Sequence, residues 1–278
     1  MYLDDFKARL WMWGPFIGFA VALVLLLIFV VPSLLEPEVD NSGGVFPYGR
    51  PYQLTLPGEL RRAYIAANGD ESSIRELNSI RASGVLETGD ERASFTSIKK
   101  RPWQSVLNLR FHTHELTFAV DGDTVWQRVQ PRGKEPIVNL KSGEEARRIR
   151  QLGAFFDPVM MLFLLGKGTI LGIREGNWED QASVVLDFEN EELALRSTAY
   201  IDPKTMFLLA RVDALPDGGN RTLLYSDHRK VLSVIEPFVI ETRVNGEFDN
   251  RVKINRIEYN VGAFSSTFEY PGPDEGVD

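Results

Sequence analysis

The chain has 278 residues, and its 31 lysine and arginine residues against 39 aspartate and glutamate residues give a formal net charge of −8. This acidic balance argues against a nucleic-acid-binding protein, which would present a basic face to the phosphate backbone. The absence of cysteine excludes disulfides, thiolate metal ligands, a cysteine nucleophile and the acylated cysteine of a lipoprotein.

Residues 10–35 carry no charged side chain, and a helix of this length crosses the roughly 30 Å of bilayer hydrocarbon. Lys7 and Arg9 precede this stretch, whereas acidic residues follow it. The positive-inside rule therefore predicts a cytoplasmic stub at residues 1–9, a single transmembrane helix and a main domain outside the cytoplasm. We expect no second span, because no other window approaches this apolar length.

A cleaved signal peptide is the alternative interpretation of this segment. Its apolar region is about 7–15 residues long and ends in a small-x-small cleavage site. The apolar run here is longer, and residues 30–34 (VVPSL) offer no good cleavage site. These features favour an uncleaved anchor.

Residues 36–44 are acidic and rich in turn-forming residues, which predicts a linker. A short amphipathic helix is expected at residues 59–68. Its apolar face consists of Leu60, Tyr64 and Ala67. Such a face must lie on another layer of the domain.

Alternating strands make up most of the remaining chain. At residues 107–112, Leu107, Leu109 and Phe111 alternate with polar residues, which predicts a half-buried strand. Residues 116–120 continue the pattern with Leu116, Phe118 and Val120, and the Asp121-Gly122 pair predicts a tight hairpin.

Further strands are expected at residues 79–86, 93–99, 124–129, 169–174, 183–188, 193–201, 207–214, 221–226, 239–244 and 252–259. Turn-forming sequences connect many of these segments. Regular short strands separated by tight turns predict an antiparallel up-and-down sheet rather than a parallel one.

Two helices are expected to interrupt these strands. Ser142 and Glu145 have capping-box spacing and predict a helix as far as residue 152. A second helix is expected at residues 158–165, after Asp157 as N-cap. This second helix is apolar on every side and must therefore be enclosed.

No group of side chains combines a nucleophile, a base and an electrostatic stabiliser, so neither an enzyme nor a cofactor is expected. His112 and His114 fall on the polar face of a predicted strand, and His228 is the only other histidine. Solvated histidines explain this pattern better than a metal site, which needs more ligands.

The strand face and the second helix together contribute a large set of apolar residues. These residues either pack against one another as a filled core, as apolar faces usually do, or line a concave space that holds an acyl chain. Flexible methionines suit the second alternative. The candidate ligand-binding residues are Leu107, Leu109, Phe111, Phe118, Val120, Phe155, Phe156, Met160, Met161, Phe163 and Leu164.

The order of these elements resembles the periplasmic lipoprotein-carrier family (LolA/LolB-like). The closing part carries most of the likeness: residues 199–211 with the Asp202-Pro203-Lys204-Thr205 bend, residues 224–229, Glu236-Pro237, and residues 257–268. In arrangement the resemblance covers residues 45–270. Its motifs are loose and mark a fold more than a function.

The resemblance implies an α+β fold in which a strongly curved antiparallel up-and-down sheet, an open half-barrel, carries a few helices over its concave face. Residues 155–165 would then be the lid of a hydrophobic cavity. Arg81 and Arg110 both suit the family's lid-latching arginine, so neither is assigned. Residues 271–278 are expected to be a disordered tail.

Function is accordingly expected to be the binding of a membrane lipid, acyl chain or lipoprotein, without covalent chemistry, by a periplasmic domain anchored in the inner membrane. The main alternative is a non-catalytic accessory subunit of an inner-membrane complex, because Gly14, Gly18 and Ala22 form a small-residue stripe that permits close helix packing. A third, weaker interpretation is a lipid-sensing domain that signals through a partner.

Overall fold

The computed structural model describes residues 53–272. The expected stub, transmembrane helix and linker, including Gly14, Gly18 and Ala22, lie outside the described residues, as does most of the expected tail. Within residues 53–272, no helix is long and apolar enough to cross a bilayer.

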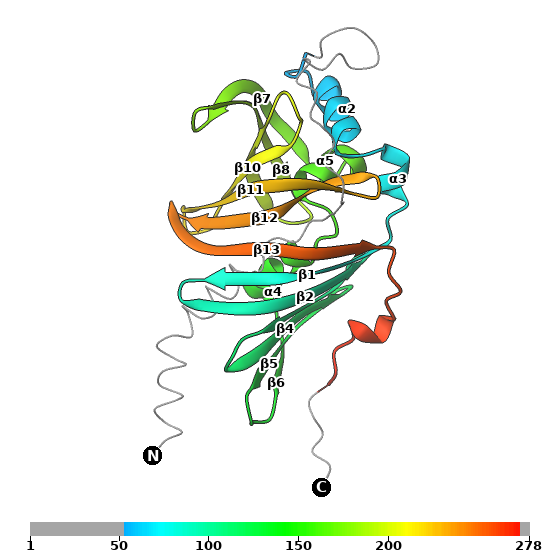
Figure 1. The fold of residues 1–278 in the computed structure, drawn as a ribbon, viewed down its shortest axis with the longest axis vertical. Coiled ribbons are helices and arrows are strands. Elements are labelled where there is room, and N and C mark those ends of the chain that lie inside the picture. The colour runs from blue at the N-terminus through cyan, green and yellow to red at the C-terminus, as the bar shows by residue number, and fades with distance from the viewer. Residues whose placement is uncertain (1–52, 273–278) are drawn as a thin grey trace.

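Four α-helices, thirteen strands and one short 3-10 helix are described within this range (Figure 1). In chain order they are α2 (Pro57–Asn68), α3 (Glu71–Arg75), β1 (Ser79–Thr88), β2 (Glu91–Lys100), β3 (Gln104–Arg110), β4 (His114–Asp121), β5 (Thr124–Pro131), β6 (Ile137–Leu140), α4 (Gly143–Gly153), α5 (Pro158–Leu165), β7 (Thr169–Trp178), β8 (Gln181–Asn190), β9 (Leu195–Ile201), β10 (Leu208–Ala214), β11 (Asn220–Val231), β12 (Val234–Val244), β13 (Glu247–Tyr259) and η1 (Ser265–Thr267).

The strands form one antiparallel sheet in the order β6-β5-β4-β3-β2-β1-β13-β12-β11-β10-β9-β8-β7. The chain starts near the middle at β1, reaches one edge at β6, crosses to the other edge at β7 and returns to β13 beside β1. Because this crossing must pass over one face of the sheet, it places α4 and α5 against that face (Figure 1). The predicted antiparallel sheet with few helices is confirmed.

The helix-covered face, called the inner face below, contains the main core. Cross-strand neighbours align in rows on it, for example Phe95 with Leu109 and Leu109 with Leu116. Side chains from α2, α4 and α5 fill the space above these rows and belong to the same buried cluster. Alternation along each strand therefore determines which residues meet the helices.

A smaller cluster lies on the opposite, outer face. It joins Val106, Ala119 and Trp126 to Phe268, which follows η1. The Trp126 indole donates a hydrogen bond of 2.9 Å to the Phe268 carbonyl. The segment after β13 is thus fixed on the outer face.

Several predicted boundaries are wrong. The strand expected at residues 107–112 ends at Arg110, so His112 lies in the turn before β4 and does not share a strand with His114. Strand β12 begins before its expected start and contains Pro237. A proline normally interrupts a strand, but here Pro237 pairs with His228 on β11, next to Asp227, which has a φ of +55°.

Helix starts were predicted with mixed success. Asp157 caps α5 as expected, accepting a 2.7 Å hydrogen bond from the backbone N–H of Val159. Helix α4 begins where expected, but the Ser142 side chain makes no capping hydrogen bond. The capping-box prediction is therefore wrong in its chemistry and right in its location.

Gly84 lies where β1 meets β13 at a register irregularity. A Cβ atom there would collide with the carbonyl oxygen of Lys253 and lie 2.8 Å from the Phe95 ring. We expect Gly84→Ala to lower the free energy of unfolding by about 1–3 kcal/mol, because backbone must shift to admit the methyl group. Urea unfolding followed by circular dichroism measures this change.

Gly58 provides the matched control for that substitution. It lies in α2, and a Cβ atom would meet nothing within 4 Å. Gly58→Ala is expected to leave stability unchanged or to raise it by up to about 1 kcal/mol through helix propensity. Equal urea midpoints of unfolding for Gly84→Ala and Gly58→Ala would contradict the packing argument at Gly84.

Candidate functional site

Helix α5 is the most apolar element of the described chain. All of its residues from Pro158 to Leu164 are buried, which confirms that this helix is enclosed. Gly166 ends it in the left-handed conformation, with a φ of +66°. The helix is thus a short apolar element that packs against the inner face.

A buried ion network holds the N-terminal end of α5. Arg211 on β10 donates a 2.8 Å hydrogen bond to Asp157, the N-cap of the helix. The same guanidinium donates two bonds, of 2.8 and 3.1 Å, to Asp213 on its own strand. Asp213 also accepts bonds from Arg221 at 2.8 Å and from Ser197 at 2.6 Å.

The two arginines and two aspartates of this network balance one another in formal charge. Burial alone would raise the pKa of Asp213, but Arg211 and Arg221 hold that pKa well below its usual value. Burial raises the pKa of Asp157, and the charge of Arg211 opposes this rise. Arg211 is only 1% exposed, so its charge depends on these carboxylates for compensation.

Arginines also hold the C-terminal end of α5. Arg61 on α2 donates a 2.6 Å hydrogen bond to the carbonyl of Phe163, and Arg75 on α3 donates one of 2.7 Å to the carbonyl of Leu164. These carbonyls belong to the last turn of the helix, where backbone acceptors lack intrahelical partners and positive charge is favourable. Side chains from other elements therefore clamp α5 at both ends.

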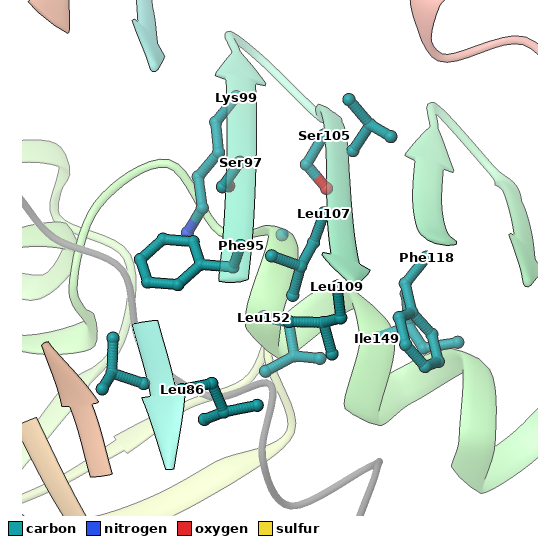
Figure 2. Close-up of a pocket in the computed structure, with 13 residues that line it drawn as sticks. Leu86, Phe95, Ser97, Lys99, Ser105, Leu107, Leu109, Phe118, Ile149 and Leu152 are labelled. Carbon is teal, nitrogen blue, oxygen red and sulfur yellow. The ribbon is translucent and has the colours of Figure 1, made fainter. Parts of the chain in front are cut away.

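A first small cavity of about 20 Å³ lies between α4 and the inner face of strands β1 to β4 (Figure 2). Leu107, Leu109 and Phe118 line it from the sheet, and Ile149 and Leu152 line it from α4. The cavity has room for about one water molecule. It is too small for an acyl chain.

One charged residue, Lys99, lies in the wall of this first cavity (Figure 2). It is 3% exposed, pairs across the strands with Ser105, and donates a 2.7 Å hydrogen bond to the carbonyl of Ala154. Burial lowers the pKa of Lys99 to about 7, against the opposing charge of Glu236. Ser97 adds a second hydroxyl to the same wall.

A second cavity, of about 50 Å³, lies beside the N-terminal end of α5. Phe156 and Met160 line it from the helical insertion, Tyr64 from α2, and Tyr225 and Glu236 from β11 and β12. Burial raises the pKa of all three ionisable groups, Tyr64, Tyr225 and Glu236, well above their usual values. Burial thus disfavours the charged form of each group.

A larger hollow of about 530 Å³ adjoins strands β7 to β11. Its lining is mostly polar and includes Asp187, Arg196, Ser197, Thr198 and Asn220. Burying apolar chain against these groups would remove them from water without new hydrogen bonds. This hollow does not suit an acyl chain.

The structure brings the predicted ligand-binding residues together in one core. All of them are buried except Leu107, which is half-buried. Those that line the first cavity are Leu107, Leu109 and Phe118, and those that line the second are Phe156 and Met160. The others, Phe111, Val120, Phe155, Met161, Phe163 and Leu164, pack within the same buried cluster.

Sequence reasoning missed the polar residues of this region. Arg81 and Arg110, the two candidates for a latching arginine, pair with Glu258 and Glu115 at the surface instead. The arginines that reach the helix are Arg211 at its N-terminal end and Arg61 and Arg75 at its C-terminal end. A usable signal existed for Lys99, because strand alternation places it on the same face as Phe95 and Ser97.

No protein-family model matches the chain, and no curated protein sequence matches it. Among solved structures, a DUF1329 family protein from Desulfovibrio piger matches with a TM-score of 0.53 and 11% identity over 76% of this chain and 95% of its own. A LolA superfamily protein from Nitrosomonas europaea matches with a TM-score of 0.48 and 11% identity over 69% of this chain and 90% of its own. The chain therefore shares its fold with this DUF1329 family protein. An identity of 11% shows a likeness of fold and extends it no further.

Proposed function

We propose that this protein reversibly binds the acyl chain of a lipid or lipoprotein on the inner face of its sheet, with α5 as a displaceable lid. The observation that carries this proposal is a wholly apolar helix held at its ends by side chains of other elements. No covalent chemistry is involved. The domain would act in the periplasm, tethered to the inner membrane by residues 10–35.

Because both cavities are too small for an acyl chain, we take the present arrangement to be the closed state of this proposal. A bound chain must therefore take the place of α5 side chains rather than enter an empty space. Burial of each methylene group contributes about 0.8 kcal/mol, which offsets the loss of helix contacts. Binding and lid closure then compete for the same apolar wall.

The ion pair between Arg211 and Asp157 is suited to such a displacement. When α5 moves away, Arg211 keeps its two hydrogen bonds to Asp213, since both lie on β10. Asp157 moves into solvent, where its charge is no longer unfavourable. Opening therefore breaks one ion pair, while Arg211 keeps Asp213 as its carboxylate partner.

The test uses the full chain in phosphatidylcholine vesicles containing a fatty acid methyl ester with a photoreactive diazirine in mid-chain. After irradiation, we expect cross-links on residues 107–120 and 155–165, and loss of these cross-links when unlabelled methyl palmitate is added. Arg61→Ala removes a clamp on α5 and should raise inner-face labelling about three- to tenfold.

Arg62→Ala is the matched control, because Arg62 neighbours Arg61 on α2 and pairs with Glu59 at the surface. Its labelling should equal that of the wild type. Cross-links confined to residues 10–35 would contradict the proposal, because the probe would then contact only the expected membrane segment.

The second candidate function, an accessory subunit of an inner-membrane complex, is supported by a different observation. Edge strand β6 exposes Ile137 and Leu140, which are 56% and 60% exposed. An edge strand that pairs on one side only and exposes apolar side chains is a surface that partners often cover. Purification in mild detergent at a fixed stoichiometry with other proteins would favour this function, and a monomer would argue against it.

A further inference from the structure

Tyr225 on β11 lines the second cavity, and its hydroxyl group is buried. The residue is 7% exposed, and its hydroxyl oxygen has no hydrogen-bond partner among the described residues. Leaving a buried polar group in this condition is energetically unfavourable. Such groups are rare and call for a functional or structural reason.

Three other polar residues around this cavity have hydrogen-bond partners. The Asn68 amide donates to the carbonyls of Tyr64 and Met206, at 2.9 and 3.1 Å. Asp157 is bound by Arg211 and by the first turn of α5. Glu236 accepts a 3.0 Å hydrogen bond from the Tyr259 hydroxyl. Tyr225 thus provides unused hydrogen-bonding capacity beside this cavity.

The size and polarity of the cavity limit what Tyr225 can bind. A volume of about 50 Å³ holds only a few heavy atoms, since one water needs roughly 10–15 Å³ of such space. The raised pKa of Tyr225 keeps its hydroxyl protonated and able to donate. Asp157 and Glu236 line the same cavity, and no lysine or arginine is among its described lining residues, so a carboxylate or a phosphate would lack a counter-charge there.

An uncharged acceptor attached to an apolar chain satisfies all of these conditions. Phe156, Met160 and Leu208 provide apolar surface directly beside the hydroxyl-bearing wall. The chain would run from here along the inner face that α5 covers in the closed state. An acyl carbonyl in an ester or an amide is the polar group that begins such a chain.

We propose that the Tyr225 hydroxyl is the anchor for the uncharged carbonyl of the bound acyl group, which occupies the cavity at the N-terminal end of α5. This assignment rests on the proposed acyl-chain binding and specifies which end of the ligand lies where. It predicts a preference for esters and amides over free fatty acids and over chains without a carbonyl.

The experiment compares four diazirine probes of equal chain length in vesicles that contain the full chain: a methyl ester, an N-methyl amide, a free acid and an alkane. In the wild type, inner-face labelling by the ester or the amide should exceed labelling by the acid and the alkane. Tyr225→Phe should reduce labelling by the preferred carbonyl probes about two- to tenfold, the range expected for one hydrogen bond. Labelling by the alkane should not change. The ester and amide results distinguish a glycerolipid-type from an amide-linked acyl group.

Tyr200→Phe is the matched control, because Tyr200 packs against Trp178 and lines neither small cavity. It should label like the wild type with every probe. The melting temperature of Tyr225→Phe should equal or exceed that of the wild type, since removal of this hydroxyl breaks no hydrogen bond within the described residues.

Equal labelling of wild type and Tyr225→Phe by the ester and the amide would overturn the assignment while leaving acyl-chain binding intact. A marked fall in the melting temperature of Tyr225→Phe would also overturn it, by revealing a structural role. Absence of inner-face labelling by all four probes in the wild type would reject both the proposed function and this assignment.

Discussion

The Arg211→Met variant is expected to have a free energy of unfolding about 3–5 kcal/mol below that of the wild type. Removing this guanidinium leaves Asp157 without its 2.8 Å partner and leaves Asp213 with Arg221 as its cationic partner. Both carboxylates are then buried with too little positive charge. Urea unfolding of the full chain in detergent, followed by circular dichroism, measures the effect.

Arg243→Met is the control for this variant. Arg243 pairs with Glu241, but its side chain is 41% exposed, so its loss should change stability by less than about 1 kcal/mol. Arg211→Lys should fall between the two variants, because an ammonium group keeps the charge but cannot form the two-pronged contact with Asp213. Similar stabilities for Arg211→Met and Arg243→Met would show that the network does not hold the core.

The same variant tests the lid. Amide hydrogen exchange in residues 158–165 should become faster in Arg211→Met than in the wild type, whereas exchange in the central strands should change less. The reason is local: Asp157 caps α5, and Arg211 fixes Asp157 to the sheet. Uniform acceleration across the domain would mean that α5 does not open as a separate unit.

Stability should depend on pH through Lys99. Its pKa in the folded protein is about 7, compared with an ordinary value of 10.5. Between these two pH values the unfolded chain binds more protons than the folded one, so stability rises with pH across this window. The slope for one such group is about 1.4 kcal/mol per pH unit.

Comparison with Lys99→Met isolates this contribution. Relative to the variant, the wild type should gain about 3 kcal/mol between pH 7.5 and pH 9.5. Lys100→Met controls for the loss of a lysine from the same strand. A constant difference between wild type and Lys99→Met across the window would mean that Lys99 remains charged in its apolar wall.

Regular patterns predicted most of the fold because they act locally. Apolar alternation located almost every strand, and the uniform apolarity of residues 158–165 predicted an enclosed helix. Errors arose where tertiary contacts override local preference. Pro237 lies inside β12, paired with His228 on β11, although proline is locally unfavourable in a strand.

The site was predictable in its apolar part and not in its polar part. Alternation identifies Leu109 and Phe118 as inward-facing, whichever elements cover them. Arg211, however, is a charged residue that sequence reasoning assigns to solvent unless its partners are known. Asp213 lies 2 residues from Arg211 in the chain, whereas Asp157 lies 54 residues away. Of these two contacts, only the one with Asp157 links the sheet to α5.

The sequence by itself determined an antiparallel, strand-rich domain with an enclosed apolar helix, because hydrophobic periodicity records which side of each element avoids water. Only the tertiary structure decided that the interior is closed around small cavities, that Arg211 and Lys99 lie inside it, and that the Tyr225 hydroxyl has no partner there. Filling of space and pairing of buried polar groups depend on distances between residues far apart in the chain, and one-dimensional patterns do not contain those distances.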